Sequence, residues 1–229
     1  MKNSSTWQDF VRLMHLPLPL FVLAFATIGA AQADHVHLDR LALTYLGLIP
    51  ALCLGAYSLD ELHGRPYHTR FNARALWLAA SVGLVGAALV AIYLAILVSI
   101  YILVLAGLAC FFILAYNLEL FGGRFHNAAW FAISWGGLST YGGYFVQDPN
   151  FSLSSLLVSA MASLFSVGIL YLTHKFRTVE FSKNMDKSSP LTDLRVYTRE
   201  ARRLAWSIVR IECISMVLLA LGLIIPKIR

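Results

Sequence analysis

The stretch ALWLAASVGLVGAALVAIYLA, residues 75–95, decides the fold, because it is apolar throughout and contains no Asp, Glu, Lys or Arg. An α-helix of about 20 residues spans the hydrocarbon core of a bilayer. The whole chain is 59% hydrophobic and 13% charged, which lies outside the usual composition of soluble domains. The sequence therefore predicts an integral membrane protein of the all-α class.

Six further apolar segments have a similar length, and together they predict a polytopic transmembrane helical bundle of about seven helices. They are expected at residues 16–32, 41–59, 97–116, 127–146, 152–173 and 205–225. No internal repeat, heptad array or low-complexity tract divides the chain. Residues 1–229 are therefore predicted to form a single transmembrane helical domain.

The distribution of basic residues predicts the orientation in the membrane, because cytoplasmic loops are enriched in Lys and Arg. With the N-terminus in the cytoplasm, fourteen basic residues lie on that side and three, including Arg40 and Lys227, lie on the other. The long polar loops then all face the cytoplasm: 60–74, 117–126 and 174–204. Any chemistry is expected on this face of a multi-pass membrane protein.

The last of these loops contains a start signal for a further helix. Thr192 and Asp193 follow Pro190 and can cap a helix that runs through Arg203 into the last apolar segment. The arginines of this helix fit either contact with anionic lipid or a diphosphate clamp.

Residues 58–74, SLDELHGRPYHTRFNAR, are the most polar connection between two apolar segments. They hold two carboxylates, two imidazoles and three arginines. An acidic pair at a helix C-terminus opposes the helix dipole, which favours a functional role for Asp60 and Glu61. Hard cations prefer carboxylate oxygens, and arginine binds phosphate bidentately. The stretch indicates a cation-dependent site for an anionic headgroup, with surface pairing to Arg65 or Arg70 as the alternative.

Three stretches resemble the UbiA superfamily of intramembrane prenyltransferases. WQDFVRLMHLPLP at residues 7–19 is similar to the amphipathic start and first helix of that family. AYSLD at residues 56–60, the arginine-rich loop after it, and AYNLELFGG at residues 115–123 occur in the family's order. The resemblance covers roughly residues 7–180.

The resemblance implies a bundle with a central cavity open to lipid, capped by cytoplasmic loops that carry two aspartate-rich motifs. These motifs hold Mg²⁺, and the ions bind an isoprenyl diphosphate. The first motif keeps one of its usual positions here, Asp60, and the second keeps one acid, Glu180. The bundle is also expected to have two helices fewer than that of the family. Losing metal ligands removes electrostatic stabilisation from a departing diphosphate.

The resemblance and the residue types together give three groups of site residues, and no catalytic residue is assigned. The predicted metal ligands are Asp60, Glu61 and Glu180. The predicted diphosphate-binding residues are Arg65, Arg70, Lys175 and Arg177. The predicted substrate pocket is lined by Tyr57, Tyr116, Asn117, Trp135 and Tyr141. Loops 60–74 and 174–186 are expected to converge on one mouth of the bundle.

Each group also has a plainer interpretation. The positive-inside rule alone explains basic cytoplasmic loops. Tyr116 fits an interfacial tyrosine, and Asn127 at the start of the fifth segment fits a helix cap. Trp135, beside Gly136 and Gly137, fits close packing between helices.

The leading hypothesis is a UbiA-like prenyltransferase that uses Mg²⁺ to transfer an isoprenyl group from a polyprenyl diphosphate to an aromatic or lipid acceptor. The depleted motifs support an alternative, a catalytically degenerate subunit that binds a prenyl lipid or a partner. A third hypothesis is a metal-dependent lipid hydrolase with His63 and His68 as zinc ligands. Membrane lipid is an expected partner, nucleic acid is not, and an oligomer or a partner subunit stays open.

Overall fold

The computed structural model describes residues 6–13, 17–181 and 192–228. A short helix, α1 (Thr6–Leu13), comes first. Three spans are simple helices: α2 (Pro17–Ala30), α5 (Ala73–Leu97) and α6 (Ile102–Asn117). The last two helices are the longest: α9 (Leu153–Phe181) and α10 (Thr192–Ile224), which ends in the 3₁₀ turn η4 (Ile225–Lys227).

Two further spans are composite, because each contains a π-helical segment. The first comprises α3 (Leu38–Pro50), η1 (Ala51–Ala56) and α4 (Tyr57–Leu62). The second comprises α7 (Ala128–Phe131), η2 (Ala132–Leu138) and α8 (Ser139–Gln147). All seven predicted segments correspond to helical spans, so the all-α class and the helix count are confirmed for the described residues.

Four spans within the described residues are long and apolar enough to cross a membrane: Leu38–Leu62, Ala73–Leu97, Leu153–Tyr171 and Ser207–Lys227. Two shorter helical stretches, Leu18–Ala30 and Ile102–Asn117, are also apolar. This is the character of an integral membrane protein. The direction in which the helices cross stays a prediction.

The prediction that the loop covers residues 174–204 is wrong in its extent. α9 continues to Phe181 and α10 begins at Thr192, so much of this region is helical. The reason is local, because no Gly or Pro occurs between Gly168 and Pro190, and a helix can continue where the sequence turns polar. The predicted helix from Thr192 through Arg203 is confirmed.

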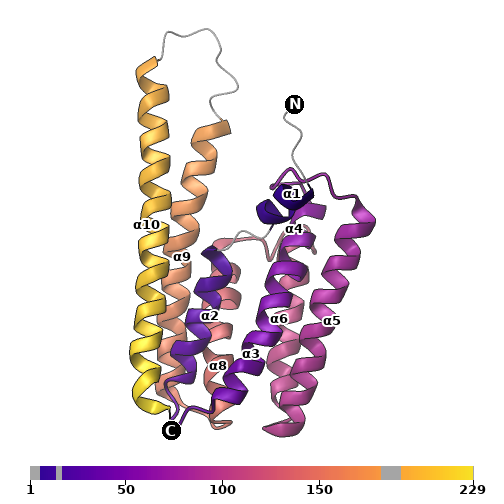
Figure 1. Cartoon of the computed structure of the whole chain (residues 1–229), viewed down its shortest axis with the longest axis vertical. Coiled ribbons are helices and arrows are strands. Elements are labelled where there is room, and N and C mark those ends of the chain that lie inside the picture. The colour runs from indigo at the N-terminus through magenta and orange to yellow at the C-terminus, as the bar shows by residue number, and fades with distance from the viewer. Residues whose placement is uncertain (1–5, 14–16, 182–191, 229) are drawn as a thin grey trace.

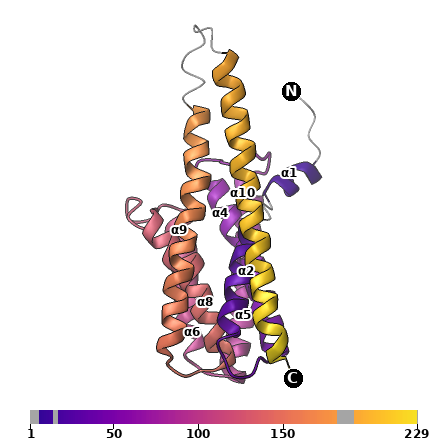
Figure 2. The same cartoon turned by 90° about the vertical axis from the view of Figure 1, so that its left-hand side faces the viewer.

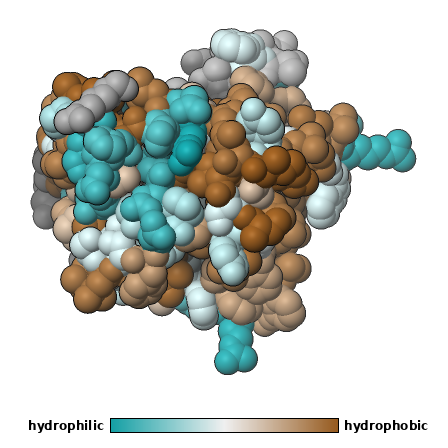
Figure 3. All heavy atoms as spheres, turned by 90° about the horizontal axis from the view of Figure 1, so that it is seen from below, coloured by the Kyte–Doolittle hydropathy of each residue, from teal (hydrophilic) through white to brown (hydrophobic). Residues whose placement is uncertain are grey.

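The bundle has two distinct ends (Figures 1 and 2). The end called upper here carries α1, the loop 63–72 and the loop 118–127, and α9 and α10 extend beyond the other helices on this side (Figure 1). The end called lower carries the connections 31–37 and 148–152 and the last described residue, Ile228. Seen from below, many hydrophilic side chains gather on one side of the lower end, and much of the other side is hydrophobic (Figure 3).

The largest core cluster joins helices that are far apart in the sequence. Phe21, Phe25 and Ile28 of α2 pack with Ile169 of α9 and with Val209 of α10, among other buried side chains. The first long helix and the last are therefore neighbours, as Figure 2 also shows for α2 and α10.

Glycine permits the closest helix approach, between α2 and α8. A Cβ atom on Gly29 would overlap the carbonyl of Thr140, and one on Gly143 would overlap the carbonyl of Ala26. Small residues at helix interfaces allow backbones to approach in this way in membrane proteins.

Two basic residues at the lower end donate to backbone carbonyls, one at the end of α8 and one in the turn that follows α2. Arg40 donates to the carbonyls of Val146 and Gln147 at the end of α8, at 3.3 and 3.1 Å. The Lys227 Nζ donates to the carbonyl of Ala33 at 2.9 Å, and Val36 forms an isolated parallel bridge with Ile228. Cations at helix C-termini are favourable, so these charges have a structural role whichever side of the membrane they face.

Candidate functional site

An apolar cavity of about 520 Å³, partly open to the surface, lies between α3, η1, α5, α6, η2 and α8. Its wall includes Leu48, Leu84, Ala106 and Leu138, together with Trp135. The volume falls in the range of small-molecule sites, and such sites are mostly apolar. The cavity is therefore a candidate binding site within the described residues.

The hydroxyl groups on the cavity wall are engaged by their own helices. Thr44 Oγ1 donates to the carbonyl of Arg40 at 2.8 Å, and Ser134 Oγ donates to that of Trp130 at 2.8 Å. Ser139 Oγ donates to the carbonyls of Trp135 and Gly136. The wall thus offers a surface suited to a hydrocarbon chain rather than to a polar group, because an unpaired polar group in an apolar site is costly.

The cavity is bounded by hydrophobic clusters on both sides. Towards the lower end, Leu94, Ile102 and Val146 line the cavity and pack together as a buried cluster. Towards the upper end, Trp135 lines the cavity and also packs against a second cluster. Three buried side chains form the core of that cluster: Leu13, Tyr57 and Leu76.

Both π-helical segments contribute to the wall, through Ala51 and Leu52 of η1 and through Ser134, Trp135 and Leu138 of η2. π-Helical turns are rare and often occur at functional sites. Nothing in the sequence patterns used above predicted them, because a π turn differs from an α turn by one residue of register.

The predicted pocket residues have separate positions. Trp135 lies on the cavity wall, and the other four are not among the lining residues. Tyr57 is buried in the cluster above the cavity, and Tyr141 packs against the cluster below it. Tyr116 stacks on His126 with ring centroids 4.4 Å apart, and the buried Asn117 donates to the carbonyl of Ile113 at 2.7 Å.

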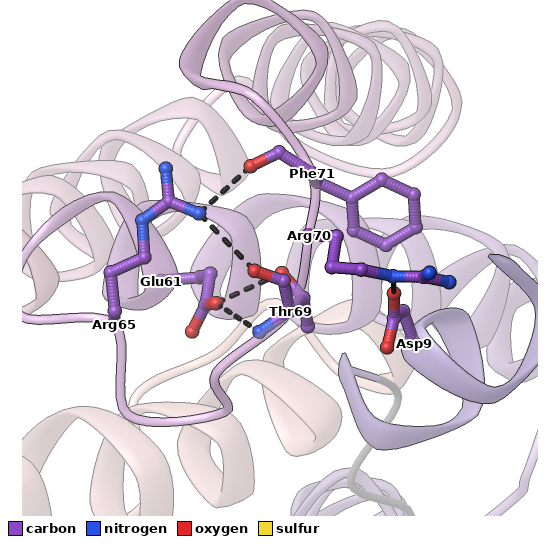
Figure 4. A network of polar contacts seen from close by, with 6 residues as sticks. All are labelled: Asp9, Glu61, Arg65, Thr69, Arg70 and Phe71. Atoms are coloured by element: carbon purple, nitrogen blue, oxygen red, sulfur yellow. Dashed lines mark hydrogen bonds and ion pairs between the residues drawn. The ribbon is translucent and has the colours of Figure 1, made fainter. Parts of the chain in front are cut away.

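Glu61, a predicted metal ligand, is fully buried and organises the loop 63–72 (Figure 4). Its carboxylate accepts hydrogen bonds from the Tyr67 amide at 2.9 Å and from the Thr69 amide at 2.7 Å. The Thr69 hydroxyl adds a third at 2.9 Å. Three donors of the protein thus already engage this carboxylate, which gives Glu61 a structural role that needs no metal.

The other two predicted metal ligands do not complete a cluster with Glu61 in the described structure. Asp60 is half-buried on the preceding position of α4. The backbone of Glu180 belongs to α9, and its side chain lies outside the described part of the structure. Within that part, no group of three or more His, Cys, Asp or Glu side chains is placed to hold a metal ion. A Mg²⁺ site stays a prediction.

The two loop arginines already have partners within the protein (Figure 4). The Arg65 guanidinium donates to the carbonyls of Thr69 and Phe71 at 3.3 and 2.8 Å, and Arg65 has a positive φ of 53°. Arg70 Nε donates to Asp9 Oδ2 of α1 at 2.7 Å. Asp9 is buried, and sequence reasoning missed it; its position in an amphipathic turn beside Trp7 and Phe10 was the available signal.

Lys175 and Arg177 have their backbone in α9, and their side chains lie outside the described residues. The loop 63–72 and the extension of α9 occur at the same end of the bundle (Figure 1). Residues 174–181 are helical, and residues 182–186 lie outside the described residues. A ligand shared between these two regions stays a prediction.

A second glutamate connects the two upper loops. Glu119 Oε2 lies 3.3 Å from His63 Nε2, and Glu119 Oε1 lies 4.0 Å from His126 Nε2. His126 Nδ1 is 2.9 Å from the carbonyl of Tyr116, so Nδ1 carries a proton there, because a carbonyl can only accept. The hydrolase hypothesis makes His63 a zinc ligand, and the structure shows its Nε2 facing Glu119.

The predicted helix cap at Asn127 is confirmed. Its side-chain oxygen accepts hydrogen bonds from the amides of Ala129 and Trp130, at 3.1 and 3.2 Å. Such a cap satisfies amides that a helix leaves unpaired at its start.

Comparisons of the chain with protein-family models, with curated proteins and with solved structures found no match.

Proposed function

We propose that this protein is a UbiA-like membrane protein that binds the isoprenyl chain of a prenyl lipid or prenyl diphosphate in the cavity between α3, α5, α6 and α8. The observation that carries the proposal is the wall of the cavity, which is apolar and whose hydroxyl groups are engaged by backbone carbonyls. A branched hydrocarbon chain is complementary to such a wall, because burial of apolar surface is the main source of binding free energy available there.

Chain binding without transfer has the more direct support. Glu61 is engaged by three donors of the loop 63–72, and Arg65 and Arg70 are engaged by carbonyls and by Asp9. A diphosphate would have to compete with these contacts. This arrangement favours the catalytically degenerate, lipid-binding subunit over the prenyltransferase.

Prenyl transfer is the second candidate, because one observation favours it. Asp60 follows η1 on the same composite helix whose residues Ala51 and Leu52 line the cavity. A diphosphate head above the cavity would then lie at the end of the bundle that carries Asp60, Arg65 and Arg70. Release of pyrophosphate would distinguish transfer from binding.

Two glycines on the cavity wall provide a test. A Cβ atom added to Gly107 of α6 or to Gly142 of α8 meets no atom within 4 Å, so Gly107→Leu and Gly142→Leu fill the cavity without a clash at Cβ. Gly86 of α5 also has open space and is not a lining residue. Gly86→Leu is therefore the matched control.

The measurement is equilibrium binding of labelled prenyl diphosphates and prenyl alcohols of several chain lengths to the purified protein in nanodiscs, with and without Mg²⁺. We expect Gly107→Leu and Gly142→Leu each to weaken binding by about tenfold or more, since each ~1.4 kcal/mol of lost contact is a factor of ten. Gly86→Leu should bind as the unmodified protein does. Equal binding by all four proteins, or no binding by the unmodified protein, would refute the proposal.

A further inference from the structure

Two described side chains of α1 that lie one turn apart contact the bundle. Asp9 and Leu13 are separated by four residues, so they share one face of this eight-residue helix. Trp7, at 69% exposure, points away from the bundle and stacks on Phe10 with ring centroids 5.8 Å apart. Among the described side chains of α1, Asp9 thus provides a charged contact and Leu13 an apolar contact with the bundle.

The charged contact is largely buried on the side of α1. The Asp9 side chain is 3% exposed, and the Arg70 side chain that it pairs with is 56% exposed. Removing one partner of a buried ion pair is costly, because the remaining charge loses its compensation. Arg70 therefore fixes α1 over the loop 63–72 (Figure 4).

The apolar contact lies directly above the cavity. Leu13 packs with Tyr57 of α4 and Leu76 of α5 in the cluster that Trp135 adjoins, and Trp135 is part of the cavity wall. Leu13 thus belongs to the hydrophobic cluster that connects α1 to the cavity wall at Trp135.

A helix as short as α1 has little stability of its own, so its position depends on these contacts. We propose that α1 is a lid on the upper end of the cavity, held closed by the Asp9–Arg70 ion pair and sealed by Leu13. The identity of the ligand that this lid would retain, a prenyl lipid, rests on the proposed function. An open lid would connect the cavity to water at the upper surface.

Cys110 of α6 is a native probe of this connection, because it is a free thiol on the cavity wall. The experiment measures how fast a charged, membrane-impermeant thiosulfonate modifies Cys110 in the full-length protein in nanodiscs. Mass spectrometry identifies the modified residue, and Cys110→Ser removes the signal. Cys53 and Cys213 are buried and serve as internal references.

Three substitutions open the proposed lid in different ways. Asp9→Asn and Arg70→Gln each remove one charge of the pair, and Leu13→Ala keeps the pair but removes the seal. We expect each to raise the rate of Cys110 modification by about tenfold or more, the effect of ~1.4 kcal/mol on an equilibrium. Arg70→Lys keeps a cation and should restore much of the slow rate. Arg74→Gln, an exposed charge on α5, should leave the rate unchanged.

The outcomes separate this inference from the proposed function. Unchanged Cys110 modification in Asp9→Asn and Leu13→Ala, with folding verified by size-exclusion profile and by the unreactive Cys53 and Cys213, would overturn the lid. A rise in all three variants, reversed in Arg70→Lys, supports it. If the rate responds to α1 but prenyl lipid never protects Cys110 or binds, the lid stands and the proposed function fails. If prenyl lipid binds while no variant changes the rate, the proposed function stands and the lid fails.

Discussion

The loops 63–72 and 118–127 are each organised by one glutamate, and the two carboxylates have contrasting surroundings. Glu61 is fully buried and accepts hydrogen bonds from two backbone amides and one hydroxyl. Glu119 is 42% exposed and lies between the imidazoles of His63 and His126. Amides are permanent donors, whereas an imidazole nitrogen donates only in the appropriate tautomer or charge state. Burial and donor type, rather than the type of residue, therefore decide how strongly each loop depends on its carboxylate.

Replacing Glu61 should have the largest effect on stability. Glu61→Ala leaves three buried or partly buried donors without their acceptor, and we expect a loss of about 3 kcal/mol or more in the free energy of unfolding. Unfolding in detergent, titrated with SDS, measures the change. Glu119→Ala in the same assay is the control, and equal losses for the two variants would remove the distinction between the loops.

The charge of Glu61 can be separated from its shape. Glu61→Gln keeps the length of the side chain but places an amide nitrogen opposite the backbone N–H of Tyr67 or Thr69. We expect a loss of about 1–2 kcal/mol, since one donor then faces another donor. The same SDS titration measures it, and a variant as stable as the unmodified protein would show that the loop can rearrange around the amide.

Arg65 supports the loop of Glu61 from the other side. Arg65→Gln removes the guanidinium donors to the carbonyls of Thr69 and Phe71, and we expect a loss of about 1 kcal/mol, because the first bond is only partly buried and the second is exposed. Limited proteolysis of the loop 63–72 should accelerate accordingly. If cleavage were instead unchanged, Glu61 alone would account for the order of this loop.

Glu119→Gln should have a small effect, within about 0.5 kcal/mol, because its partners are half-exposed and water can replace the carboxylate. The SDS titration used for Glu61 gives the direct comparison. A loss comparable to that of Glu61→Gln would mean that Glu119 also holds its loop in place.

Mg²⁺ without a prenyl diphosphate should have the smallest effect. The Glu61 carboxylate already has three donors, and Mg²⁺ retains several waters unless phosphate oxygens complete its coordination. We expect no measurable change in the unfolding midpoint on adding Mg²⁺ or a chelator. A marked increase that Asp60→Asn abolishes would instead establish a preformed metal site at the end of α4.

The apolar segments could be predicted from the sequence because hydrophobic length determines which helices cross a membrane. The contacts of the upper end could not, because they join residues far apart in the chain: Asp9 and Arg70 are separated by 61 positions. Glu61 was identified as important, but its partners depend on a loop in which Arg65 and His68 adopt positive φ. Positive φ is uncommon for residues other than Gly, and the turn signals Gly64 and Pro66 do not specify it. Trp135 lies on the cavity wall, beside the glycines that marked it in the sequence; its role in a substrate pocket stays a prediction.

The packing of α2 against α10 has a consequence for the order of assembly during synthesis. Phe21, Phe25 and Ile28 of α2 find their partners on α9 and α10, which the ribosome delivers only after every other long helix. Until then this face of α2 must be solvated by lipid or by an insertion factor. Contacts of such long sequence separation form late and slowly. The bundle is therefore completed only when α10 has been made. α10 then packs against α2, and the Val36–Ile228 bridge forms.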